Sequence, residues 1–227
     1  LRKRSKIRFI IIHYTGMKKE SRAIKRLCDF KSNVSAHYFI KKNGNILNLV
    51  PDLYEAWHAG ASNWKKYKFL NKNSIGIEIQ NPGHEYGYEN FTLKQINSLR
   101  KLLKKLMKSY KINLNNVLGH SDIAPVRKKD PGEKFPWENL AKFKLAKWHK
   151  LKEKKLKKFR LIKLTQKEEE QFLKNLFSIG YNSIKISKSN FNNRFLFKAF
   201  QRRFRQNLIN GKSDQECLLI SKNLLKP

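Results

Sequence analysis

Hydrophobic positions in the first half of the chain follow two patterns that predict buried strands. Residues 7–14 form a nearly continuous apolar run rich in isoleucine, which favours a central strand covered on both faces. Residues 74–80 alternate instead, so that three isoleucines share one face while Gly76, Glu78 and Gln80 share the other. Gly76 leaves room beside Glu78, which predicts a cleft on the polar face of this strand.

A long amphipathic helix and three shorter strands complete the first part of the pattern. Thr92 and Gln95 have capping-box spacing, and apolar residues then recur every three or four positions up to residue 110. Strands are expected at 35–40 and 46–50, joined by an Asn-Gly turn, and at 117–119. These elements predict an α/β fold with a central mixed β-sheet flanked by helices.

The pattern changes after residue 137. A helical segment is expected at 137–148, and a lysine-dense tract with few apolar positions follows it. Three short amphipathic helices are then expected before the end of the sequence. We therefore predict a larger α/β domain at 1–148, a basic linker at 149–164 and a small three-helix domain at 165–227.

The chain is strongly basic, because 51 lysine and arginine residues stand against 17 aspartate and glutamate residues, a formal net charge of +34. Such a field favours polyanionic partners, namely nucleic acid, anionic lipid or an acidic polymer. The alternative is that the lysines are ordinary surface residues with no role in binding a partner. No nucleic-acid recognition motif is present in the sequence and aromatic residues do not interleave with the basic tract, which disfavours nucleic-acid binding.

The two cysteines are far apart, which excludes a Cys-type zinc module.

The segment 119–132 is the strongest candidate for chemistry. It is polar, broken by two prolines and bounded by glycines, and it carries His120 and Asp130. His13 lies at the end of the first predicted strand, where α/β proteins often place functional groups. Zinc catalysis needs three protein ligands and one open position, and His13, His120 and Asp130 fit this as a two-histidine, one-carboxylate set if the loop folds back. The alternative is a histidine that is only hydrogen-bonded at a strand end.

Glu78 and Lys128 are the candidates for proton transfer and charge stabilisation. A general base must lie beyond the ligands but close enough to take a proton from water at the metal, and Glu78 suits that role. A cation near the developing oxyanion lowers the barrier, and Lys128 is placed for this. Spacing alone leaves the alternative that Glu78 is a solvated strand residue.

The sequence resembles the zinc-dependent N-acetylmuramoyl-L-alanine amidases of the AmpD/AmiD type, which are related in fold to peptidoglycan recognition proteins. The matching segments occur in the family's order and read Ile-Ile-His-Tyr-Thr, Ser-Ala-His-Tyr, Ala-Trp-His-Ala-Gly, Asn-Ser-Ile-Gly-Ile-Glu and Gly-His-Ser-Asp-Ile-Ala-Pro-x-Arg-Lys-x-Asp-Pro-Gly. They lie at 11–15, 35–38, 56–60, 73–78 and 119–132.

The resemblance implies that His13, His120 and Asp130 bind Zn²⁺, that Glu78 is the catalytic acid/base and that Lys128 assists at the oxyanion. It implies hydrolysis of the amide between N-acetylmuramic acid and L-alanine, in peptidoglycan or its fragments, during cell-wall turnover or recycling. Substrate contacts are expected from three residues of the matching segments: His37, Trp57 and His58. For His37 the alternative is a hydrogen bond across the sheet.

The C-terminal region resembles a small helical peptidoglycan-binding domain. Its pattern of Phe-Gln-x-x-Phe followed by Gly-x-x-Asp places Gln201, Phe204, Gly211 and Asp214 at matching positions. The AmiD-type branch of the family carries such a module. We therefore expect a monomeric enzyme of the periplasm or cell envelope, with the cytoplasm as the alternative, that contacts the anionic wall or membrane surface electrostatically. The competing interpretations are a non-catalytic peptidoglycan-recognition protein and a basic nucleic-acid-binding protein.

Overall fold

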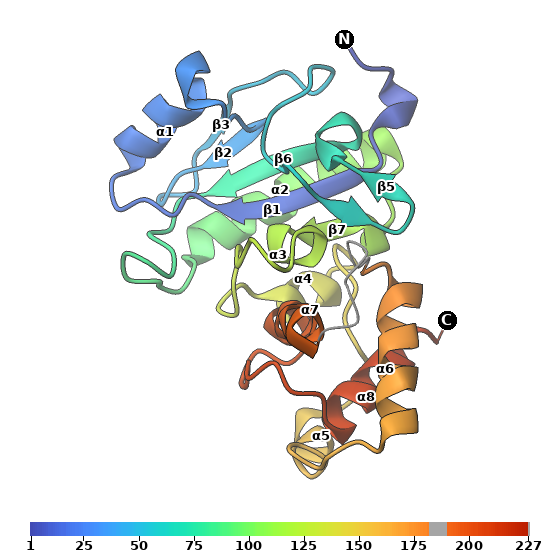
Figure 1. Cartoon of the computed structure of the whole chain (residues 1–227). Helices are drawn as coiled ribbons and strands as arrows, with labels where there is room; N and C mark the ends of the chain where they lie inside the picture. The colour runs from blue at the N-terminus through green and yellow to red at the C-terminus, as the bar shows by residue number, and fades with distance from the viewer. Residues whose placement is uncertain (182–189, 227) are drawn as a thin grey trace.

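A five-stranded sheet forms the centre of the protein (Figure 1). The structure, a computed structural model, describes residues 1–181 and 190–226, with the backbone alone at 190–192. The strands lie in the order β3-β2-β6-β1-β7, with every pair parallel except β2 and β3. The predicted mixed sheet is thus confirmed. The strand bounds are β1 Phe9–Tyr14, β2 Tyr38–Ile40, β3 Ile46–Asn48, β6 Ser74–Ile79 and β7 Val117–Gly119, with a separate hairpin of β4 Asn63–Trp64 and β5 Tyr67–Lys68.

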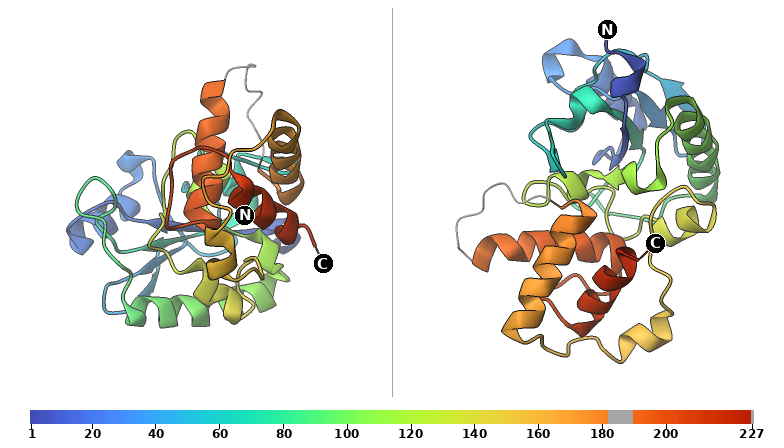
Figure 2. Two further views of the ribbon diagram at one scale, coloured as in Figure 1. Left: turned by 90° about the horizontal axis from the view of Figure 1, so that it is seen from below. Right: turned by 90° about the vertical axis from the view of Figure 1, so that its right-hand side faces the viewer.

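Helices cover both faces of the sheet. Helix α2, with the predicted capping box at Thr92, lies along one face, and the C-terminal helices lie beyond the other (Figure 2). The expected helix at 137–148 is wrong in length, because α4 ends at residue 142 and Lys144 then takes a positive φ of 57°. The helices are α1 Glu20–Cys28, α2 Leu93–Tyr110, α3 His120–Ile123, α4 Trp137–Lys142, α5 Glu153–Lys157, α6 Gln166–Ile179, α7 Asn190–Phe204 and α8 Gln215–Leu224, with short 3-10 turns at Arg4–Lys6, Phe30–Ser32, Leu70–Asn73 and Leu114–Asn116.

The alternation along β1 divides the core into two clusters. Ile10 and Ile12 pack with the apolar face of α2, whereas Phe9 and Ile11 pack on the opposite side. That second cluster continues without a break into the C-terminal helices, where it includes buried side chains such as Phe200. The hydrophobic core therefore spans both predicted domains, and the boundaries at 149–164 stay a prediction. Within the described residues, no helix is both long and apolar enough to cross a membrane.

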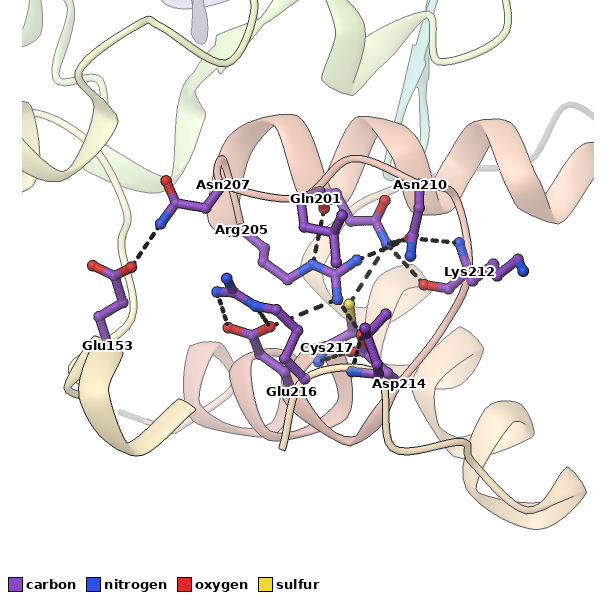
Figure 3. Close-up of polar contacts among 12 residues, drawn as sticks. Glu153, Gln201, Arg205, Asn207, Asn210, Lys212, Asp214, Glu216 and Cys217 are labelled. Atoms are coloured by element: carbon purple, nitrogen blue, oxygen red, sulfur yellow. Dashed lines mark hydrogen bonds and ion pairs between the residues drawn. The ribbon is translucent and has the colours of Figure 1, made fainter. Parts of the chain in front are cut away.

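The C-terminal pattern singled out in the sequence holds the helices together. The Gln201 side chain accepts from the Gly211 backbone N–H at 2.8 Å and donates to the Lys212 carbonyl at 2.8 Å. Asp214 caps α8 and pairs with the buried Arg205 (Figure 3). These polar residues stabilise the turn between α7 and α8. A peptidoglycan-binding role for 165–227, a range that includes positions outside the described residues, stays a prediction.

Candidate active site

Three side chains from distant parts of the chain converge at the carboxyl end of β1. His13 Nδ1 lies 2.9 Å from His120 Nδ1 and 2.9 Å from Asp130 Oδ2, and the third edge of this triangle is 3.1 Å. All three residues are buried. The loop after β7 folds back as expected, because the Ser121 N–H donates to the Asp130 carbonyl at 2.8 Å. The predicted ligand set is therefore assembled in space.

A chain of hydrogen bonds decides which nitrogen of His13 is free. The Leu70 carbonyl can only accept, so Ser74 Oγ donates to it at 2.6 Å and accepts from His58 Nε2 at 3.2 Å. His58 Nδ1 then accepts from His13 Nε2 at 3.0 Å. With a metal bound, this chain favours the proton of His13 on Nε2 and leaves Nδ1, which faces Asp130 and His120, as the ligand atom.

A backbone carbonyl decides the same question for His120. His120 Nε2 lies 3.1 Å from the Ala59 carbonyl, which can only accept, and 3.4 Å from Arg127 Nη2, which can only donate. The shorter contact favours a proton on Nε2 and leaves Nδ1 as the ligand atom. Arg127 donates to the same carbonyl at 2.9 Å and to the Ala61 carbonyl at 3.0 Å. Arg127 and Ser74 lie within matching segments, but the sequence alone assigned them no role.

Glu78 lies beside His13 on the neighbouring strand. The parallel register pairs His13 with Glu78, and both point to the face opposite α2. Among the described residues, Glu78 Oε2 is buried without a hydrogen-bond partner. Burial, and then the negative charge of Asp130, raise the pKa of Glu78 well above its ordinary value, while Lys128 acts in the opposite direction. Glu78 is therefore a poorly solvated carboxyl group with a raised proton affinity.

A cavity of about 360 Å³ opens onto this cluster. Its walls include His13, Glu78, Lys128 and Asp130, so the proposed ligands, base and cation face the same space. Lys128 is half-buried. The cavity is thus a single site in which a substrate can reach all of these groups.

The three residues expected to contact substrate lie in different environments. Trp57 lines the cavity and is 40% exposed, as a stacking surface requires. His58 also lines it, but its ring is buried and fills the space above Gly76, where a Cβ would lie 2.4 Å from the imidazole. Gly76 therefore makes room for His58 and not for substrate.

His37 differs from its expected role as a substrate contact. It is fully buried and does not line the cavity. Its Nδ1 accepts from the Gly76 N–H at 3.0 Å, and its Nε2 lies 3.0 Å from the Tyr54 carbonyl and 2.7 Å from Arg2. The alternative of a hydrogen bond within the sheet describes His37 better, because the ring is sealed beneath the strand.

Comparisons with known proteins agree with this geometry. The family model for N-acetylmuramoyl-L-alanine amidase matches residues 3–133. The amidase AmiD of Escherichia coli is 34% identical over 97% of this chain and 83% of its own length. The 1,6-anhydro-N-acetylmuramyl-L-alanine amidase AmpD of Haemophilus influenzae is 42% identical over 48% of this chain and 58% of its own length. The chain belongs to the N-acetylmuramoyl-L-alanine amidase family.

The solved structures extend the family likeness beyond the matched segment. A complex of E. coli AmiD with anhydro-N-acetylmuramic acid-L-Ala-D-gamma-Glu-L-Lys has a TM-score of 0.84 at 32% identity, covering 99% of this chain and 90% of that one. The C-terminal helices, which lie outside the residues matched by the amidase family model, are therefore part of a shared architecture.

An aromatic rim borders the amidase cavity and was not foreseen from the sequence. His84 Nδ1 accepts from the Tyr14 hydroxyl at 2.8 Å, its Nε2 lies 3.0 Å from Glu133, and its ring stacks on Tyr88 at 4.4 Å between centroids. Tyr14 and His84 both line the cavity. No sequence signal marked His84, because it lies in a loop without periodic structure.

Replacing Ser74 with alanine is expected to weaken metal binding in this amidase. The loss should not exceed the roughly 10–100-fold cost of removing a ligand's own hydrogen-bond partner, because Ser74 acts on His13 through His58. The change removes the acceptor that holds the proton of His58, and hence that of His13, in place. Competition with a chromogenic chelator measures the affinity. Ser221→Ala is the matched control, since that serine is equally buried and bonds only within the C-terminal helices. If Ser74→Ala and Ser221→Ala bound the metal with equal affinity, Ser74 would have no effect on His13 through His58.

The metal-free protein is expected to lose stability as the pH falls from about 6.5 to 4. Burial, assisted by neighbouring positive charge, lowers the pKa of His13 and His37 to about 4 and that of His58 well below its ordinary value. At these three histidines the unfolded chain therefore binds more protons in this range, and each contributes a slope of about 1.4 kcal/mol per pH unit. The raised pKa of Glu78 acts in the opposite direction and offsets about one of the three. Urea unfolding in the presence of chelator measures this, and a stability that stays level between pH 7 and 5 would exclude it.

Proposed function

We propose that this chain is a zinc-dependent N-acetylmuramoyl-L-alanine amidase that hydrolyses the amide between N-acetylmuramic acid and L-alanine in peptidoglycan or its fragments, in cell-wall turnover. The observation that carries the proposal is the convergence of two imidazole nitrogens and one carboxylate oxygen beside Glu78, whose Oε2 is buried without a hydrogen-bond partner. Family membership and the similarity to the AmiD complex with an anhydromuramyl peptide support the substrate class.

The donor set fits a zinc ion. Tetrahedral zinc with bonds of about 2.0–2.1 Å has its ligand atoms about 3.3 Å apart. The edges between His13, His120 and Asp130 are 2.9–3.1 Å, so a shift of a few tenths of an ångström accommodates the ion. Burial alone would raise the pKa of Asp130, but the two imidazoles outweigh it and hold that pKa below its usual range, which keeps the carboxylate ionised. When bound, zinc polarises the scissile carbonyl and lowers the pKa of water in its open position.

The remaining groups supply proton transfer and charge stabilisation. The Glu78 carboxylate takes a proton from the attacking water and returns it to the departing amine of L-alanine, and its raised pKa suits both steps. Lys128 places a positive charge at the same cavity, where it stabilises the oxyanion of the tetrahedral intermediate. Trp57 offers a flat apolar surface for the sugar or the peptide.

Mass spectrometry of muropeptide digests tests the proposal directly. The protein should release the stem peptide from N-acetylmuramic acid, and chelator should stop the release until zinc is restored. Intact peptidoglycan and anhydro-muropeptides are compared as substrates. Binding of muropeptide without release would instead favour the non-catalytic recognition protein.

The net charge of +34 supports action at an anionic surface, and we include the cell envelope in the proposal. Fractionation of cells locates the protein. Recovery in the cytosolic fraction alone would exclude the envelope while leaving the amidase activity intact.

A further inference from the structure

A buried aspartate connects the loop that carries His120 to the C-terminal helices. Asp122 lies two residues after His120 in α3 and is 1% exposed. One oxygen accepts from the Gly119 N–H at 2.8 Å and from Arg203 Nη1 at 2.5 Å, and the other accepts from the Tyr181 hydroxyl at 2.7 Å. Two of these three donors therefore come from the C-terminal part of the chain.

Arg203 holds both ends of the segment that delivers His120. Its Nη1 binds Asp122, just after His120, and its Nη2 donates to the Val117 carbonyl at 3.0 Å, at the start of β7. Its guanidinium also lies over the Trp137 ring, 4.2 Å from the centroid. Arg203 itself is 3% exposed, so the contact is sealed from water. The ribbon views show α7 beside α3, between the sheet and the other C-terminal helices (Figure 1).

The contacts of Arg203 and Tyr181 with Asp122, called the clamp below, are sensitive to the loss of any one side chain. A buried ion pair contributes orientation more than net stability, whereas losing one partner leaves an uncompensated charge in a water-free site. With Arg203 absent, Asp122 would keep a single backbone donor and the Tyr181 hydroxyl. The β7–α3 junction would then lose its bonds to Arg203 at both ends, and His120 would be held less firmly in its orientation.

A second arginine, just after the end of α7 at Phe204, provides a contrast. Arg205 is also 3% exposed and ion-paired, but its partners Asp214 and Glu216 both belong to the C-terminal region (Figure 3). Arg203 lies in the last turn of α7 and reaches the loop that carries His120, whereas Arg205 lies just after the helix and pairs only with carboxylates of the C-terminal region.

We propose that the C-terminal helices position the metal site: Arg203 and Tyr181 clamp Asp122, which fixes the direction of His120. Arg203, Tyr181 and Asp122 are thus positioning residues, and this gives the C-terminal region a role that is separate from its predicted binding of the cell wall. The inference rests on the proposed zinc function.

The test compares Arg203→Met and Tyr181→Phe with Arg205→Met in the full chain. Zinc affinity is measured by chelator competition, and hydrogen exchange of the Gly119 amide is measured in the metal-free protein, relative to amides of α2. Arg203→Met should weaken zinc binding by about 10–100-fold, Tyr181→Phe by about threefold or more, and both should speed Gly119 exchange. Arg205→Met should lower the unfolding temperature and leave both of these readouts unchanged.

Three outcomes overturn the inference. If Tyr181→Phe and Arg203→Met bound zinc with the affinity of the parent chain, the positioning role of these residues would be excluded and the amidase function would be unaffected. An equal loss in Arg205→Met would reduce the effect to general destabilisation. A parent chain that binds no zinc would remove the proposed function and the clamp together. If Arg203→Met fails to fold, Tyr181→Phe decides, since it deletes one hydroxyl and keeps the ring packed against Trp64.

Discussion

Replacing Glu78 with glutamine is expected to lower kcat by about 10²–10⁴-fold, the usual contribution of a positioned general base. The same change should make the metal-free protein more stable near neutral pH. Because burial raises the pKa of Glu78, the folded state disfavours its ionised form, and stability falls as the pH rises above the pKa of the unfolded chain. Glutamine has the same shape but no charge, so it removes the free-energy cost of burying the ionised carboxylate. Stem-peptide release and thermal unfolding with chelator measure the two effects.

Glu216→Gln is the matched control for this variant. Glu216 is 1% exposed and, unlike Glu78, is paired with both Arg160 and Arg205. Its loss should destabilise the protein by about 1–3 kcal/mol and leave kcat unchanged. If Glu78→Gln lowered stability as Glu216→Gln does, Glu78 would be a structural residue and the assignment as base would fail.

Replacing Asp130 with asparagine is expected to weaken zinc binding by more than the roughly 10–100-fold lost with an outer partner, and to abolish release of stem peptide at limiting zinc. Stability should change in the direction opposite to that of Glu78→Gln. The pKa of Asp130 is held below its usual range, so its charge favours the folded state at neutral pH and its removal destabilises the metal-free protein.

Zinc titration and urea unfolding with chelator separate the two effects of Asp130→Asn. Asp214→Asn provides the control, because Asp214 is also buried and ion-paired but lies in the C-terminal helices. It should lower stability and leave zinc affinity as in the parent. An Asp130→Asn protein that still binds zinc with parental affinity would exclude the carboxylate as a ligand.

The local patterns predicted the elements near the site correctly. The apolar run of β1 and the alternation of β6 are confirmed, and the parallel register of the two strands then places His13 and Glu78 on one face. Such predictions succeed because strand periodicity depends on neighbouring residues alone. The expected helix beyond Lys142 failed for a local reason too, since a positive φ at Lys144 ends it.

The roles of the other histidines depended on packing between distant segments. His58 and His37 belong to similar motifs, yet one bonds to His13 and the other is sealed beneath the sheet. Motif position does not distinguish these environments, because the order of the strands decides which ring reaches the cavity. The expectation of a substrate contact from His37 arose from that ambiguity.

Residue types and spacing in the sequence indicated the α/β class and made His13, His120 and Asp130 candidate ligands and Glu78 a candidate base. The resemblance to the amidase family then selected these roles over their alternatives. Only the tertiary structure decided how the ligands are oriented, through Ser74 and His58 on one side and through the clamp of Arg203 on Asp122 on the other. The physical reason is that hydrogen bonds between residues tens of positions apart follow from strand order and helix docking, and neither leaves a periodic signal in the chain.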